Sequence, residues 1–71
     1  MKEKVIFCHE NKIELYLKLF NTRRLLVLVT DISQINTEII KVVVIHSFDN
    51  EPINSNLELP LSFIENAIPL I

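Results

Sequence analysis

Three neighbouring residues near the N-terminus, Cys8, His9 and Glu10, have side chains that could act together. Thiolate, imidazole and carboxylate groups are the usual zinc ligands. We predict, however, that residues 4–9 form a strand, in which neighbouring side chains point to opposite faces. Cys8 and His9 could then not easily bind one ion. His46 could approach either of them from a paired strand and complete a three-ligand set with Glu10, but a buried thiol and a structural histidine are the more common outcome. We therefore predict no metal site, and we interpret Cys8 as a buried thiol and His9 as a satisfied or edge-exposed histidine.

Two adjacent arginines, Arg23 and Arg24, begin a strand-like segment and could grip a phosphate or carboxylate group of a partner. Tyr16 and Phe20 are predicted to share the outer face of the preceding strand, near Arg23. Aromatic residues and arginine are enriched at protein interfaces, and aromatic side chains also stack on single-stranded nucleic acid. The carboxylates do not cluster in the sequence, and nothing marks a nucleophile–base pair. We therefore predict no catalytic residue and no cofactor site.

The composition excludes several classes of function. The chain has no glycine, so a glycine-rich phosphate loop or dinucleotide fingerprint cannot be present. Its formal net charge is −2 and its basic residues are dispersed, which is not the pattern of a dedicated nucleic-acid-binding domain. No apolar run approaches the length needed to cross a bilayer, and the N-terminal residues do not resemble a signal peptide. We expect a cytoplasmic protein without a membrane partner.

The size of the chain points to association. With 71 residues we expect one small domain over residues 1–71, and so small a domain usually needs a crosslink, a metal ion or a partner. A single cysteine excludes an intrachain disulfide, while hydrophobic residues make up 49% of the sequence. The apolar end of the chain, Leu70 and Ile71, is expected to dock on its own chain or on a neighbouring one. We therefore predict a homo-oligomer or a complex with another protein.

The elements that must position these residues are predicted from periodicity and turn residues. Residues 38–48 are rich in β-branched side chains and give the strongest strand prediction, and residues 23–31, apolar on both faces, read as a central strand. Asparagines between the apolar runs are expected to supply the left-handed turn positions that glycine would otherwise occupy. The other expected elements are strands over residues 4–9, 13–20 and 57–63, a loop over residues 49–56, and a helix over residues 63–68 that begins with the capping-box residues Ser62 and Glu65.

The segment from Glu14 to Asp31 resembles a hairpin of a known family. Glu14-Leu15-Tyr16, Leu19-Phe20, Arg23, Leu25-Leu26-Val27-Leu28-Val29 and Asp31 are similar to the hairpin in the small Tudor-like domain of the PipX transcriptional coactivators. The resemblance implies a protein-binding adaptor rather than an enzyme, and it implies a strand over residues 13–20.

These observations predict a mainly β fold: a small antiparallel barrel (SH3-like or Sm-like) or a curled sheet of four or five strands, with a short C-terminal helix. The alternative is an α+β fold in which residues 11–21 are helical, since a polar stripe with helical spacing runs through them. The expected function is a non-catalytic interaction module, such as a regulatory adaptor, that self-associates or binds a protein. A small nucleic-acid-binding barrel is the second hypothesis. The predicted contact residues are Tyr16, Phe20, Arg23, Arg24, Leu70 and Ile71.

Overall fold

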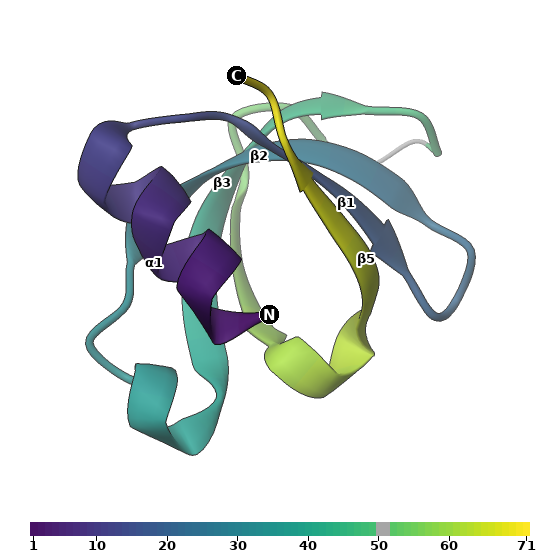
Figure 1. The fold of residues 1–71 in the computed structure, drawn as a ribbon. Coiled ribbons are helices and arrows are strands. Elements are labelled where there is room, and N and C mark those ends of the chain that lie inside the picture. The colour runs from purple at the N-terminus through teal and green to yellow at the C-terminus, as the bar shows by residue number, and fades with distance from the viewer. Residues whose placement is uncertain (50–51) are drawn as a thin grey trace.

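The computed structural model describes residues 1–49 and 52–71, in which an N-terminal helix packs against a curled sheet (Figure 1). Two short 3₁₀ turns, η1 and η2, interrupt the strands. The elements in chain order are α1 (Lys2–Asn11), β1 (Leu15–Leu19), β2 (Arg24–Asp31), η1 (Ile35–Thr37), β3 (Ile39–Ser47), β4 (Asn56–Pro60), η2 (Leu61–Phe63) and β5 (Ile64–Pro69).

The five strands form one open antiparallel sheet in the order β4-β3-β2-β1-β5. The first four strands form a meander, and β5 returns to pair with β1. The prediction of a mainly β chain with antiparallel strands is therefore confirmed. Residues 15–19 are a strand, so the alternative in which residues 11–21 are helical is wrong.

The inner face of the curled sheet forms the core. Alternate side chains of each strand point inward, as the burial pattern of β1 shows, because successive strand residues face opposite sides of a sheet. Leu15, Leu17, Leu25 and Val27 are completely buried. The core also contains Val29, Ile40, Val42, Val44, Leu59, Leu61, Ile64 and Ala67 from the sheet and η2, with Val5 and Cys8 from α1.

The predicted strand over residues 4–9 is wrong, because residues 2–11 form α1. Val5 and Cys8, three residues apart, are completely buried against the inner face of the sheet, whereas Phe7 between them is exposed. The helix ends at Lys12, which has a left-handed conformation (φ 54°) and donates its backbone N–H to the carbonyl groups of Cys8 and His9. The β-prone run Val-Ile-Phe-Cys is helical because tertiary packing overrides local propensity.

The predicted C-terminal helix is also wrong: residues 64–69 form strand β5. A bulge causes the error. Leu19 pairs with Ile64 while Lys18 pairs with Asn66, so Glu65 is an extra residue in the ladder. The inward-facing residues Ile64 and Ala67 are therefore three positions apart, which imitates the spacing of a helix in the sequence.

The left-handed positions are not mainly asparagines, contrary to the prediction. Among the described residues, Lys12, Thr22, Glu38 and Asn54 have positive φ, and only the last is an asparagine. Helix ends and tight turns impose this conformation on whatever residue stands there. The predicted loop over residues 49–56 is described only in part, because residues 50 and 51 lie outside the described residues.

The side chain of Asp31, at the end of β2, is hydrogen-bonded to the first residues of the connection to η1. Its carboxylate accepts hydrogen bonds from the backbone N–H of Ser33 (2.8 Å) and from the Ser33 hydroxyl (3.1 Å). The Ser33 backbone N–H is the main reason that the pKa of Asp31 lies below its ordinary value, and the hydroxyl lowers it further. Because the pKa is lower in the folded state, ionised Asp31 stabilises the fold above the pKa of the unfolded chain, and this contribution disappears as the pH falls through the folded-state pKa.

We therefore expect Ser33→Ala to raise the pKa of Asp31 part of the way toward its ordinary value, because the larger contribution, from the backbone N–H, remains. The measurement is an NMR titration of the Asp31 side chain in both proteins. Ser62→Ala, which replaces another exposed serine, is the control and should leave the titration unchanged. An unchanged Asp31 pKa in Ser33→Ala would contradict the conclusion that the Ser33 hydroxyl helps to lower the pKa of Asp31.

Candidate interaction surface

The outer face of the sheet carries a row of neighbouring side chains from four strands. Tyr16 of β1 pairs with Ile68 of β5 on one side and with Leu26 of β2 on the other, and Leu26 pairs with His46 of β3. Their sequence neighbours Leu15, Leu17, Leu25 and Val27 are completely buried, so the residues of this row face outward. Tyr16 and Leu26 are half-buried, while His46 and Ile68 are exposed.

Phe48, just after β3, joins this row into an aromatic cluster. Its ring lies 6.1 Å from the ring of Tyr16 and 4.7 Å from that of His46, both in edge-to-face geometry. The Arg24 guanidinium lies 5.4 Å from the centre of the Phe48 ring, within cation–π range. The edge-to-face geometry is the favourable one for aromatic pairs, because the positive edge of one ring meets the negative face of the other. We call Tyr16, Arg24, Leu26, His46, Phe48 and Ile68 the outer-face cluster.

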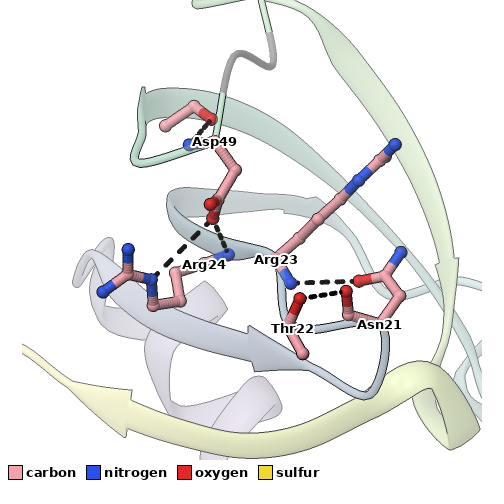
Figure 2. Close-up of polar contacts among 6 residues, drawn as sticks. Asn21, Thr22, Arg23, Arg24 and Asp49 are labelled. Atoms are coloured by element: carbon pink, nitrogen blue, oxygen red, sulfur yellow. Dashed lines mark hydrogen bonds and ion pairs between the residues drawn. The ribbon is translucent and has the colours of Figure 1, made fainter.

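Asp49 holds Phe48 in this position. Its carboxylate accepts a hydrogen bond from the backbone N–H of Arg24 (2.8 Å) and lies 3.8 Å from the Arg24 Nε, as Figure 2 shows. The backbone N–H of Phe48 donates to the carbonyl of Arg24 (3.2 Å). These hydrogen bonds, one from the Phe48 backbone and one to the Asp49 side chain, join the segment after β3 to the start of β2.

The side chains of Arg23 and Arg24 do not lie together. In Figure 2 the two side chains extend in different directions: Arg24 lies next to Asp49, and Arg23 points away from it. The Arg23 backbone N–H donates to the Asn21 side chain (3.1 Å) in the tight turn between β1 and β2, where Thr22 is left-handed (φ 71°). Of the two predicted arginines, only Arg24 lies in the outer-face cluster.

The structure separates Phe20 from Tyr16. Phe20 follows β1, and its backbone N–H donates to the carbonyl of Phe63 in η2 (2.9 Å). Both phenylalanines line a shallow hollow of about 340 Å³ together with Leu19, Asn21 and Ser62. Tyr16 instead contacts Phe48. The single aromatic platform predicted from the sequence is therefore two apolar surfaces.

At the C-terminal end, the backbone of Leu70 pairs within the chain, while the side chains of Leu70 and Ile71 are exposed. The backbone N–H of Leu70 donates to the Glu14 carbonyl (2.9 Å), which continues the pairing of β5 with β1. The side chain of Leu70 is 49% exposed and that of Ile71 is 92% exposed. Leu70 follows Ile68 by two residues, so strand alternation directs it to the outer face.

Cys8, His9 and His46 are not brought together. Cys8 is buried in the core, and burial raises the pKa of its thiol. His9 lies one residue further along the helix, with its Nδ1 3.1 Å from the carbonyl of Val29, and His46 is on the outer face. In residues 1–49 and 52–71, no three His, Cys, Asp or Glu side chains lie close enough to hold a metal ion. None of the helices in these ranges has the length and apolar character that crossing a bilayer requires.

The sequence did not indicate that His46, Phe48 and Ile68 belong to one surface, or that Asp49 contacts Arg24 beside it. His46 and Phe48 are two positions apart in a strand-forming segment, which is the only local sign that they share a face. Ile68 was placed in the predicted helix, where no cross-strand pairing with Tyr16 could be anticipated. Comparisons of this chain with models of known protein families, with curated proteins and with solved structures found no match, so the resemblance of its hairpin rests on the residues of the hairpin alone.

Proposed function

We propose that the chain is a non-catalytic interaction module that binds a protein partner through its outer-face cluster. The observation that carries this proposal is the row Ile68–Tyr16–Leu26–His46, which crosses four strands on the side of the sheet that α1 leaves open. Helix α1 contributes Val5 and Cys8 to the core under the inner face, so it does not cover this row.

The composition of the surface suits a protein partner. Protein interfaces are enriched in aromatic residues and arginine at their centre and have a polar rim. Here Phe48 contacts both Tyr16 and Arg24, and Lys18 of β1, paired with Glu65 at 3.0 Å, is the strand partner of Arg24. The Arg24–Asp49 contact holds Phe48 in place before binding, which reduces the entropy lost when a partner orders the surface.

The same charges disfavour nucleic acid as the partner. Lys18 and Arg24, two cations on the outer face at the aromatic cluster, are paired with Glu65 and Asp49 respectively. A phosphate backbone would have to displace those carboxylates, and the formal net charge of −2 opposes its approach. The adaptor hypothesis therefore fits the surface better than the nucleic-acid-binding hypothesis.

The test uses a photo-crosslinking residue placed at His46 in a lysate of the source cells. A protein captured there is then purified and its dissociation constant measured against the wild type, Phe48→Ser and Phe7→Ser. Phe7 and Phe48 are 44% and 50% exposed, but Phe7 lies on α1, away from the cluster, and is the matched control.

We expect Phe48→Ser to weaken binding by about tenfold or more, because loss of an aromatic hot spot at the centre of an interface costs about 2 kcal/mol or more and about 1.4 kcal/mol is tenfold. Phe7→Ser should leave the dissociation constant unchanged. Equal binding by all three proteins, or the capture of no protein from His46, would contradict the proposal.

A further inference from the structure

The two edges of the sheet differ in whether their outward backbone groups are open. An edge strand presents every second N–H and C=O to solvent, and these groups can pair with a strand of another chain. In the ladder between β3 and β4, the N–H of Val44 donates to Ser55 (2.9 Å), so this is a hydrogen-bonded pair. Such pairs alternate along an antiparallel ladder. Leu57 and Leu59 therefore bond to β3, and the backbone groups of Asn56 and Glu58 point outward.

On β5, the outward groups of Ala67 are capped within the chain. The Leu70 N–H bonds to Glu14, and by the same alternation the backbone groups of Ala67 and Pro69 face outward. The Ala67 N–H donates to the Asn66 side chain (3.0 Å), and the Ala67 carbonyl accepts from Lys4 Nζ (3.3 Å). Pro69 has no N–H to offer. The bulge at Glu65 further disrupts this edge.

The edge at β4 has no such protection. In the part of the chain that the structure describes, neither a backbone nor a side-chain group bonds to the outward N–H and C=O groups of Asn56 and Glu58. Leu57 between them is packed against the core but only half-buried, since it lies on the outermost strand. This edge thus combines available hydrogen-bonding groups with an incompletely covered leucine.

We propose that β4 pairs antiparallel with β4 of a second copy of this chain. The register that uses both outward residues places Glu58 opposite Asn56 of the second copy, with reciprocal N–H to C=O bonds on each side. Leu57 then lies opposite Leu57 of the second copy, in a non-hydrogen-bonded pair, where side chains come closest. This register covers the half-buried leucine and keeps the two Glu58 carboxylates from facing each other, which would be destabilising.

The assembly closes at two chains. Head-to-tail pairing of β4 with β5 would need an open β5 edge, and the caps on Ala67 remove it. Two β4 strands related by a two-fold axis use up the open edge of both chains, so growth stops at the dimer. The inference goes beyond the proposed partner binding and uses another surface, so either can fail while the other stands.

The first test is sedimentation of the wild type, Glu58→Pro and Glu58→Gln from micromolar to millimolar concentration. Proline at position 58 removes the N–H that would bond to the second copy, and its ring occupies the outer edge of β4. The hydrogen bonds between β3 and β4 do not use this N–H and remain, so Glu58→Pro should fold and stay monomeric. Glu58→Gln keeps the N–H and should dimerise at least as well as the wild type. A monomeric wild type throughout this range would overturn the proposal, as would a dimer that Glu58→Pro leaves intact.

Hydrogen exchange of the unmodified protein gives a test that does not depend on a variant folding. The amide protons of Asn56 and Glu58 should exchange fast in dilute solution and become protected as the concentration rises. Protection that does not change with concentration would overturn the proposal.

The closure of the dimer is tested by opening the β5 edge. The double variant Lys4→Ala with Asn66→Ala removes both caps from Ala67 and should form species larger than the dimer. Its circular dichroism and thermal unfolding are compared with those of the wild type to establish that it is folded. A folded double variant that stops at the dimer would refute the role of the caps.

Discussion

Replacing Leu17 with alanine is expected to lower the free energy of unfolding by about 2–5 kcal/mol, the usual cost of removing a fully buried leucine side chain. Leu17 is completely buried in the middle of the inner face, between its strand partners Leu25 and Ala67, which are also completely buried. A domain with 71 residues has roughly 4–11 kcal/mol of total stability at about 0.05–0.15 kcal/mol per residue. The loss is therefore a large fraction of the whole.

The measurement is chemical denaturation followed by circular dichroism, with Leu70→Ala as the matched control. Both variants remove the same atoms, but the Leu70 side chain is 49% exposed and lies beyond the last strand. We expect a change within about 0.5 kcal/mol for Leu70→Ala, as is usual for surface positions. Similar losses for both variants would show that Leu17 is not in the core.

Introducing a charge on the inner side of α1 is expected to have the second large effect. Val5→Asp should destabilise the protein by about 3 kcal/mol or more, because a carboxylate would be buried without a partner or α1 would have to leave the sheet. Val5 is completely buried, and the adjacent Lys4 already donates to the carbonyl of Ala67 on β5. The measurement is the same denaturation experiment.

The control for this change is Phe7→Asp, on the same helix and 44% exposed. Aspartate has a similar effect on helix propensity at both positions, so the difference between the variants reports burial. A second readout is the reaction of the Cys8 thiol, which is buried beside Val5 in the core, with a thiol reagent. It should become fast in Val5→Asp and stay slow in Phe7→Asp. Equal stability of the two variants would contradict the packing of α1.

The strands that could be predicted are those whose signal is local. Residues 15–19 alternate between buried and half-buried positions, and β3 contains a β-branched run that disfavours a helix. The predicted segments 13–20, 23–31 and 38–48 therefore contain β1, β2 and β3 completely. The break between the predicted segments 13–20 and 23–31 coincides with the turn between β1 and β2, in which Thr22 is left-handed.

The errors lie at the two ends of the chain, where local patterns mislead. Val5, Ile6 and Phe7 favour a strand by type, yet they lie on α1, because Val5 and Cys8 fill the space beneath the curled sheet. The bulge at Glu65 gives β5 the burial spacing of a helix. Neither the space nor the bulge exists until the strands have paired.

The residues of the outer-face cluster were also only partly predictable from the sequence. Tyr16 and Arg24 were predicted as contact residues from their types and from their placement around the hairpin, and both lie in the outer-face cluster. Phe48, His46 and Ile68 join them only because β3 and β5 flank the hairpin in the sheet.

By itself, the sequence determined the mainly β fold, the central strands and the excess of apolar residues, because side-chain periodicity and β-branching act over a few neighbouring residues. Only the tertiary structure decided which edge of the sheet is open and which is capped, that the N-terminus is a helix, and which aromatic residues meet. These features depend on residues as far apart as Lys4 and Ala67, and strand pairing and register between distant segments leave no periodic trace in the sequence.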